Sequence, residues 1–264
     1  MIQPLAYIHP QAKIAENVVI EPFVTIHKNV EIGEGTWIGS NVVIMDGARI
    51  GKNCRIFPGA VISGIPQDLK FAGEDTTAEI GDNTTIRECV TINRGTKDRW
   101  QTVVGNNCLI QAYSHIAHDC LVGNNCIFSN SSTLAGHITV GDYVVLAGMV
   151  AVHQFCHIGS HAFVAGGSLV RKDVPPYVKA AREPLSYVGI NSVGLRRRGF
   201  SSDQINEIQD IYRTMFIKNN NLTKALDIIE AECKPTEIRD EILDFVRSSN
   251  RGVMKGFGHG KIGL

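Results

Sequence analysis

The chain has 264 residues, and its 26 basic side chains balance its 26 acidic ones. A neutral chain lacks the basic excess of a non-specific nucleic-acid-binding protein, and 44% apolar residues with 20% charged ones exclude a disordered tail protein. No apolar run approaches the roughly 18 residues of a membrane span, and the first residues lack the pattern of a secretory signal. We therefore expect a cytoplasmic protein without a nucleic-acid partner and without stable membrane insertion.

Residues 1–175 repeat with a period of six. A large apolar residue recurs at every sixth position from Ile8 to Ile62, and the pattern resumes over Ile80–Ile92 and Val104–Val170. A small residue stands two positions earlier in nearly every hexad. Short strands produce this spacing and a helix does not, because side chains at i and i+2 share one face of a strand. We predict a mainly β fold, a parallel β-helix of hexapeptide repeats with three short strands in each coil.

Two interruptions of the repeat predict loops that leave the same edge of the prism. Ile-Gly and Val-Gly pairs mark one column every 18 residues if the gap after Ile62 holds a 12-residue insertion and the gap after Ile92 a 6-residue one. The predicted loops are residues 63–79 and 93–102. Five of the seven cysteines occupy the small inward position, which predicts core packing. These cysteines are Cys54, Cys108, Cys120, Cys126 and Cys156.

The C-terminal part has a different pattern. We expect the repeat to stop at Val174–Tyr177, because the two prolines there break a strand ladder. Residues 176–200 then form a connector, and residues 201–264 a C-terminal α-helical domain of three amphipathic helices. Short helices are unstable alone, so we expect them to pack on each other and on the prism end or a neighbouring chain. Their expected N-caps are Ser201 or Ser202, Thr223 and Thr236.

Histidines gather near the loop-bearing edge over three successive coils. Neighbouring coils lie about 5 Å apart, so their imidazoles can cluster. Gly136 lies one coil beyond His118, where its N–H can face a developing oxyanion. Asp119 can orient His118 only at a corner, because neighbouring strand residues point oppositely; otherwise it is a turn residue. The histidines are His115, His118, His137 and His153.

The histidine cluster permits three interpretations. It can make hydrogen bonds at a surface or interface, or three imidazoles can bind zinc. It can also supply a general base beside an oxyanion donor, acting on a hydroxyl of the substrate, since no serine triad or reactive cysteine is evident. Gln67–Lys70 in the first loop is either a solvated segment or a contact to a polar ligand. Arg196–Arg198 near the tail is either a solvated face or a phosphate-binding group.

Five segments together are specific for one family. They are His115–Cys120, Leu134–His137, Ala151–Phe155, Asp173–Tyr177 and Gly194–Phe200. Through them the chain resembles the bacterial UDP-N-acetylglucosamine O-acyltransferases over nearly its whole length. The resemblance, and not the repeat, implies a left-handed coil. It also implies a cytoplasmic homotrimer that transfers a 3-hydroxyacyl chain from acyl carrier protein to the sugar 3-hydroxyl of UDP-N-acetylglucosamine, the first step of lipid A synthesis. No metal and no cofactor are expected beyond the phosphopantetheine arm of the carrier protein.

The resemblance also implies roles for single residues. His118 matches the general base, Asp119 the acid that supports it, and Gly136 the oxyanion donor. Gly166 matches the residue that ends the acyl groove. Residues that position substrate across a cleft between subunits are matched by Gln67, Asp68, Lys70, His115, His137, His153 and Gln154. Nucleotide contacts are matched by Asn191 and Arg197, and the neighbouring Arg198 is placed with the substrate-binding residues.

Two positions depart from the family pattern. Asn93 stands where the family has a histidine, and Val193 where it often has an acid, which leaves the details of sugar and uridine recognition undecided.

Three other functions stay open. They are another hexapeptide acyltransferase (N-acyl or acetyl-CoA-dependent), a zinc enzyme of the carbonic anhydrase kind, and a non-catalytic scaffold. His115 and His118 are separated by fewer residues than we expect for zinc ligands of the carbonic anhydrase kind, which argues against the zinc enzyme. The edge loops argue against a scaffold.

Overall fold

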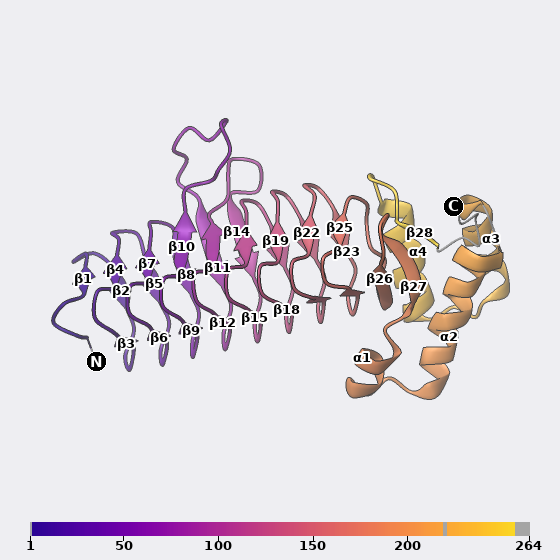
Figure 1. Ribbon diagram of the computed structural model, residues 1–264, viewed down its shortest axis with the longest axis horizontal. Coiled ribbons are helices and arrows are strands. Elements are labelled where there is room, and N and C mark those ends of the chain that lie inside the picture. The colour runs from indigo at the N-terminus through magenta and orange to yellow at the C-terminus, as the bar shows by residue number, and fades with distance from the viewer. Residues whose placement is uncertain (1, 219–220, 257–264) are drawn as a thin grey trace.

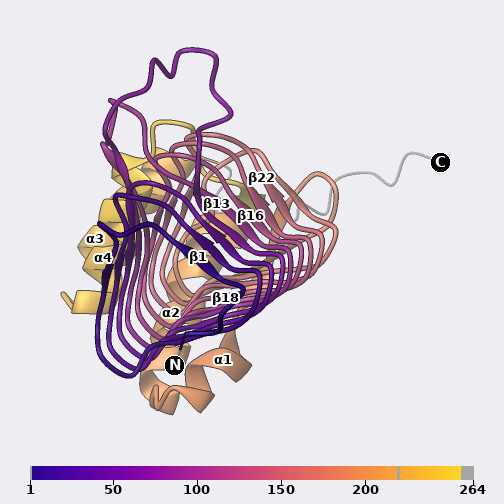
Figure 2. The same ribbon diagram turned by 90° about the vertical axis from the view of Figure 1, so that its left-hand side faces the viewer.

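The structure, a computed structural model, describes residues 2–218 and 221–256. Its main body is a parallel β-helix with the N-terminus at one end and the helices at the other (Figure 1). Seen end on, the coils stack around a three-sided core (Figure 2). The chain visits three sheets in turn, which we call sheets I, II and III, and each strand pairs with the equivalent strand of the next coil.

The strands of each sheet are short, commonly two residues. Sheet I consists of β1 (Tyr7–Ile8), β4 (Thr25–Ile26), β7 (Val43–Ile44), β10 (Val61–Gly64), β13 (Thr91–Asn93), β16 (His115–Ile116), β19 (Thr133–Leu134), β22 (Ala151–Val152) and β25 (Leu169–Val170). Sheet II consists of β2 (Lys13–Ile14), β5 (Glu31–Ile32), β8 (Ala48–Ile50), β11 (Thr77–Ile80), β14 (Gln101–Val104), β17 (Leu121–Val122), β20 (Thr139–Val140) and β23 (His157–Ile158). Sheet III consists of β3 (Val19–Ile20), β6 (Trp37–Ile38), β9 (Arg55–Ile56), β12 (Thr85–Ile86), β15 (Leu109–Ile110), β18 (Ile127–Phe128), β21 (Val145–Leu146), β24 (Phe163–Val164), β26 (Val178–Ala181), β27 (Ser186–Ile190) and β28 (Lys255–Gly256).

The large residue of each hexad fills the interior of the prism. From Ile20 to Val170 these residues are at most 4% exposed. Burying one such side chain stabilises the fold by about 1.5–3 kcal/mol, so each coil adds its own share of core. The five cysteines of the small inward position are buried free thiols, as predicted for core residues.

Most corners of the prism turn through a residue with positive φ, the third after the large inward residue. We call it the corner residue. Asparagine and glycine often hold this position, since they tolerate left-handed backbone at little cost. At some corners a reactive or aromatic residue stands there instead, for example Asp119 (φ 58°) and His137 (φ 63°). Corner residues of successive coils lie above one another, so their side chains form columns.

Both gaps in the repeat hold extra residues, and the columns continue past them. Ile62 pairs with Ile92, and Ile80 pairs with Ile50, so the two gaps preserve the columns. The loops leave the corner between sheets I and II, which we call corner I–II, and protrude from it together (Figures 1 and 2). They span residues 65–76 and 94–100, shorter than predicted, because β10, β11, β13 and β14 extend into them and pair there.

The prolines do not end the sheet. β26 follows them and pairs in parallel with β24, and β27 returns antiparallel to β26. Pro175 and Pro176 occupy the turn before β26, where no ladder hydrogen bond needs their missing N–H. The predicted connector 176–200 therefore contains a hairpin and also helix α1 (Ser192–Arg197).

The remaining helices cover the end of the prism (Figure 1). They are α2 (Ser202–Arg213), which continues as the π-helix η1 (Thr214–Lys218), α3 (Leu222–Glu232) and α4 (Glu237–Ser248). Ser201 and Thr236 cap α2 and α4 as expected, but Asn221 and not Thr223 caps α3. The Tyr212 hydroxyl donates to the carbonyl of Pro176 over 2.7 Å and so ties α2 to the prism. Residues 219–220 and 257–264 of the predicted helical domain lie outside the described residues.

In the described part of the chain, every helix is too short or too polar to cross a lipid bilayer.

Candidate active site

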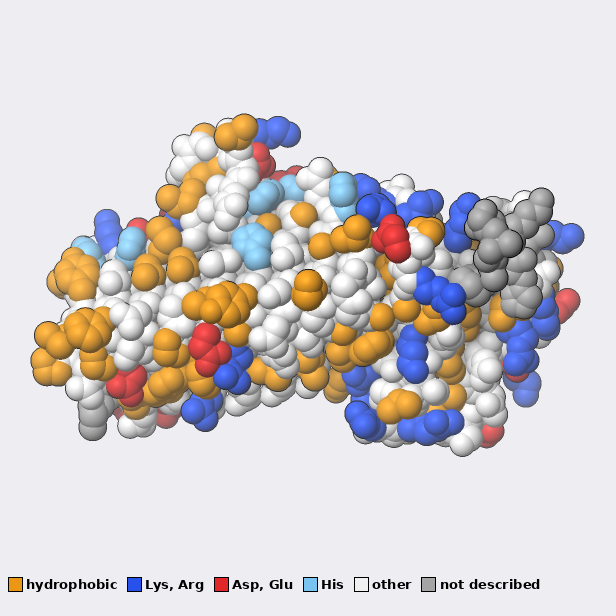
Figure 3. All heavy atoms as spheres, in the orientation of Figure 1, with side chains coloured by type: hydrophobic (Ala, Val, Ile, Leu, Met, Phe, Trp, Pro, Cys, Tyr) orange, Lys and Arg blue, Asp and Glu red, His pale blue; other side chains and the backbone are white. Residues whose placement is uncertain are grey.

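His118 and Asp119 lie at corner I–II, immediately after β16. His118 is 9% exposed and Asp119 is fully buried. His118 Nδ1 lies 2.7 Å from Asp119 Oδ2. Because the chain turns at this corner, the two side chains converge. A corner position is the condition under which the sequence predicted that Asp119 can orient His118. In the space-filling view, histidine side chains gather beside the protruding loops (Figure 3).

The loop 94–100 holds the Asp119 carboxylate. The Thr96 N–H donates to Oδ1 over 3.0 Å and the Thr96 hydroxyl to Oδ2 over 2.7 Å, while the Arg99 N–H donates to Oδ1 over 3.1 Å. Burial works to raise the pKa of Asp119, but the hydrogen bonds from His118, Thr96 and Arg99 outweigh it and lower the pKa. An ionised Asp119 accepts from the Nδ1–H of His118 and leaves Nε2 with its lone pair. Such a nitrogen can serve as a base.

Thr96 and Arg99 contact the Asp119 carboxylate, and the sequence did not predict these contacts. Their signal was indirect, since the predicted second insertion leaves the same edge as the histidines. Which of its residues turn back toward Asp119 depends on the folded loop, and no local pattern specifies it.

Gly136 lies directly against the His118 imidazole. A Cβ atom at Gly136 would come within 2.6 Å of His118 Cε1 and 2.8 Å of Nε2. Only glycine therefore leaves the ring in this position. Among the described residues, the Gly136 N–H makes no hydrogen bond, so it is free to meet a ligand.

His137 completes the group on the next coil. Its ring stacks on Phe155, with centroids 4.6 Å apart, and meets His118 edge-on at 5.0 Å. Its Nδ1 lies 2.9 Å from Asp98 Oδ2 and 3.9 Å from Asp119 Oδ2. Asp98 and Phe155 thus fix His137 from two sides, contacts that were not assigned from the sequence.

The geometry bears on the zinc interpretation. Of the described residues, His118, Asp119 and His137 bring donor atoms within 4.8 Å of one another. His115 does not join them, because its Nδ1 lies 2.7 Å from the Thr91 hydroxyl on sheet I. Burial, with a smaller effect of nearby His118, lowers the pKa of His115. Since the Asp119 oxygens already accept several hydrogen bonds, the group resembles an oriented base more than a set of three zinc-binding imidazoles.

The other residues predicted near this edge share it without contacting His118. His153 and Gln154 are exposed one coil beyond Gly136, and His153 Nδ1 lies 3.2 Å from the carbonyl of Gln154. In the loop 65–76, Asp68 accepts a hydrogen bond from the N–H of Lys70. Gln67 and Lys70 are exposed there.

Other corners hold the predicted nucleotide contacts Asn191 and Arg197, the predicted substrate-binding residue Arg198, and Gly166. Asn191 caps α1, and its Nδ2 donates to the carbonyl of His161 at corner II–III, the corner that follows the strands of sheet II. Arg197 and Arg198 end α1 beside that corner. Gly166 follows β24, at the corner between sheets III and I. One chain therefore does not bring these residues to His118.

The two positions that depart from the family pattern differ in exposure. Asn93 is 5% exposed, and its Nδ2 donates to the carbonyl of Ile65 at the root of the first loop. Val193 is 49% exposed on α1.

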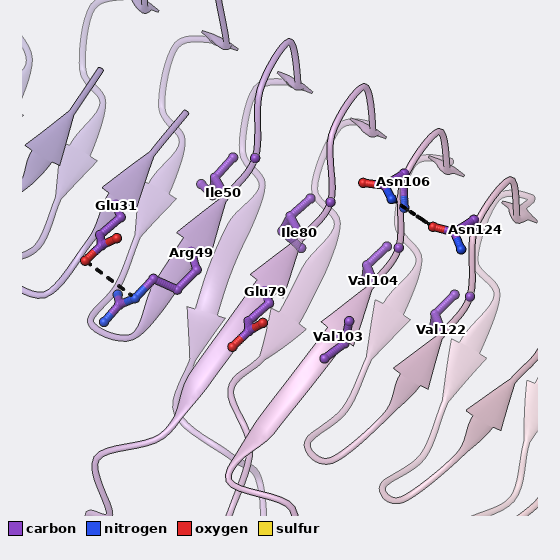
Figure 4. Close-up of a pocket in the computed structure, with 14 residues that line it drawn as sticks. Glu31, Arg49, Ile50, Glu79, Ile80, Val103, Val104, Asn106, Val122 and Asn124 are labelled. Atoms are coloured by element: carbon purple, nitrogen blue, oxygen red, sulfur yellow. Dashed lines mark hydrogen bonds and ion pairs between the residues drawn. The ribbon is translucent and has the colours of Figure 1, made fainter. Parts of the chain in front are cut away.

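A shallow pocket lies on the outer face of sheet II, away from these groups (Figure 4). Glu31, Arg49 and Glu79 project from its strands, and Arg49 Nε lies 3.9 Å from Glu31 Oε1. None of the predicted site residues lines it within the described structure. His118 lies instead at corner I–II, beside the protruding loops.

Comparisons with known proteins match both parts of the fold. Residues 173–254 match the family model described as UDP N-acetylglucosamine O-acyltransferase, domain 2. Residues 101–136 match the bacterial transferase hexapeptide family, and residues 2–66 match the GMPPB C-terminal domain.

Relatives match along nearly the whole chain. A curated acyl-[acyl-carrier-protein]–UDP-N-acetylglucosamine O-acyltransferase of Xanthomonas oryzae is 48% identical over 257 residues, 97% of this chain and 98% of the relative. The solved UDP-N-acetylglucosamine acyltransferase of Bacteroides fragilis is 51% identical, covers 97% of this chain and 100% of its own, and superposes with a TM-score of 0.95. That of Francisella novicida is 42% identical, with coverage of 98% and 95% and a TM-score of 0.94.

These matches confirm the predicted fold class, a left-handed parallel β-helix of hexapeptide repeats with C-terminal helices. The resemblance seen in the sequence is likewise confirmed. The chain is an acyltransferase and belongs to the family of acyl-[acyl-carrier-protein]–UDP-N-acetylglucosamine O-acyltransferases.

Proposed function

We propose that the protein transfers a 3-hydroxyacyl chain from acyl carrier protein to the 3-hydroxyl of UDP-N-acetylglucosamine, the first step of lipid A synthesis. Both substrates are those in the names of the relatives. The observation that carries the mechanism is the alignment of the Asp119 carboxylate, the His118 imidazole and the Gly136 backbone.

The proposed step uses His118 as general base. Nε2 takes the proton of the sugar hydroxyl while its oxygen attacks the thioester carbonyl, which forms the new C–O bond. The Gly136 N–H donates to the tetrahedral oxyanion. As the intermediate collapses, the C–S bond breaks, and the departing phosphopantetheine sulfur takes the proton from His118. General-base catalysis contributes about 10²–10⁴-fold, and an oxyanion donor about 10²–10³-fold.

The transfer proceeds without an acyl-enzyme. The cysteine nearest in sequence to the site, Cys120, is fully buried in the core, and burial raises the pKa of its thiol to about 12. A neutral, inward-pointing thiol is a poor nucleophile. The hydroxyl of the acceptor sugar is then the attacking group.

We infer that the protein acts as a homotrimer. His118 at corner I–II and Arg198 at corner II–III lie on different edges of one prism, yet both are assigned to one substrate. Three parallel prisms around a threefold axis bring unlike edges of neighbouring copies together. Such a cleft places corner I–II of one copy beside corner II–III of the next, so His118 and Arg198 can reach one substrate.

The test is His118→Ala. We expect turnover to fall by about 10²–10⁴-fold, the share of a general base, while the melting temperature stays within a few degrees. His157→Ala is the matched control, since His157 projects from β23 on sheet II. Wild-type turnover in His118→Ala would reject the assignment of the base.

Two further measurements separate the alternatives. An O-acyl product is cleaved by mild alkali and an N-acyl product is not, so alkali-stable product would favour the N-acyl enzyme. The close donor atoms of His118, Asp119 and His137 justify a metal analysis of the purified protein. Stoichiometric zinc required for turnover would favour the carbonic-anhydrase-like alternative.

A further inference from the structure

Three aromatic corner residues form a column at corner II–III. Tyr143, His161 and Tyr177 hold this position with φ values of 59°, 62° and 66°. The Tyr143 and His161 rings stack with centroids 5.0 Å apart and 7° between their planes, and His161 and Tyr177 stack at 5.5 Å and 12°. Phe200 closes the column edge-on, 5.1 Å from His161. His161 is therefore held on both faces and one edge.

The column is tied to the helices at its base. The Tyr177 hydroxyl donates to the Glu241 carboxylate on α4. Asn191 connects the column to α1, because its N–H donates to the carbonyl of Tyr177 over 2.7 Å and its Nδ2 to that of His161 over 2.9 Å. Hydrogen bonds thus join the column to α4 and to the start of α1.

Arg198 contacts the end of this column that Tyr143 and His161 form. Its Cζ lies 5.2 Å from the centre of the Tyr143 ring, and its Nη1 lies 3.5 Å from His161 Nδ1. Burial, and then the charge of Arg198, lower the pKa of His161 to about 4. At neutral pH the imidazole is uncharged and retains one nitrogen that can accept from the guanidinium.

A free arginine side chain samples many rotamers, and ordering it on binding costs affinity. Ring contact with Tyr143 and the acceptor on His161 reduce that cost before the ligand arrives. A guanidinium has five N–H donors, so contact with His161 through Nη1 leaves others for the oxygens of an anionic ligand such as a phosphate.

We propose that His161 is a positioning residue: with Tyr143 it holds the Arg198 guanidinium ready for the diphosphate of the nucleotide sugar. The inference rests on the proposed function, in which Arg198 belongs to the substrate-binding residues. It assigns His161 no contact with the reacting atoms.

The decisive variant is His161→Phe. Phenylalanine keeps a ring between Tyr143 and Tyr177 but cannot accept a hydrogen bond, and Phe23 and Phe155 already occupy corner positions with φ of 64° and 63°. We expect the KM for UDP-N-acetylglucosamine to rise about tenfold, which corresponds to about 1.4 kcal/mol. The kcat, the KM for acyl carrier protein and the melting temperature should stay near wild-type values.

A double-mutant cycle with Arg198→Ala isolates the coupling. His161→Phe should add nothing to the KM once Arg198 is gone. His157→Phe, the same substitution on the outer face of sheet II in the same coil, is the matched control and should behave as wild type.

The possible failures differ. If Arg198→Ala raises the KM and His161→Phe does not, the positioning role is overturned while the proposed function stands. A lower melting temperature with a lower kcat in His161→Phe would show a structural role and overturn it as well. If neither variant changes the KM, the assignment of Arg198 to the nucleotide fails, and the positioning role with it.

Discussion

At the scale of single residues, the absence of a side chain at Gly136 matters as much as the presence of His118. We predict that Gly136→Ala lowers kcat by about 10²-fold or more, because the new Cβ would lie 2.6 Å from His118 Cε1 and push the base away from its substrate. Steady-state kinetics check this. Gly148→Ala is the control, since the nearest atom to its Cβ, the Asn130 carbonyl oxygen, lies 3.5 Å away. Equal turnover in both variants would contradict the account.

The buried carboxylate of Asp119 makes a second prediction, on stability and pH. The folded-state pKa of Asp119 lies below its ordinary value of 3.8. Its ionised form therefore stabilises the protein at pH values above about 4, and this stabilisation is lost as the pH falls through the lowered pKa.

We expect Asp119→Asn to be less stable than wild type at pH 6 and to lose less stability between pH 6 and pH 3. Urea unfolding at a series of pH values measures this difference. Asp227→Asn, which changes an exposed carboxylate on α3, should keep the wild-type slope. The account fails if Asp119→Asn also keeps that slope.

At the scale of elements, the loop 94–100 holds the Asp119 carboxylate through hydrogen bonds from Thr96 and Arg99. Thr96→Val removes the hydroxyl that donates to Asp119 Oδ2 and keeps the shape of the side chain. A hydrogen bond to a charged group contributes about 1.5–3 kcal/mol, so we expect the free energy of unfolding to fall by that amount. Turnover should fall too, while the KM values stay unchanged. Thr25→Val, on the outer face of β4, is the control. Equal stability and equal turnover in Thr96→Val and Thr25→Val would show that the hydrogen bond from Thr96 to Asp119 contributes nothing.

The elements also show what the sequence could predict. The hexads predicted the strands, the columns and both insertions, since one inward isoleucine per strand is a local signal, and Ile62 indeed pairs with Ile92. Hydrogen bonds between residues far apart in the sequence were not predictable, because the contact of Thr96 with Asp119 depends on how a loop folds back. Similarly, Pro175 and Pro176 signalled a stop, but the parallel pairing of β26 with β24 continued the sheet.

At the scale of the whole molecule, the separation of His118 and Arg198 on different corners leads to the last prediction. If each site takes His118 from one subunit and Arg198 from the next, two inactive variants can complement each other. Co-expressed His118→Ala and Arg198→Ala chains form mixed trimers, and random mixing gives about a quarter of the interfaces both wild-type residues. We expect purified mixtures to recover up to about a quarter of wild-type turnover, although each variant alone is nearly inactive at low substrate concentration. Were both residues of a site supplied by the same subunit, every site would carry one substitution and mixing would restore nothing, so tagging the two chains differently and assaying only doubly tagged trimers decides between the two arrangements.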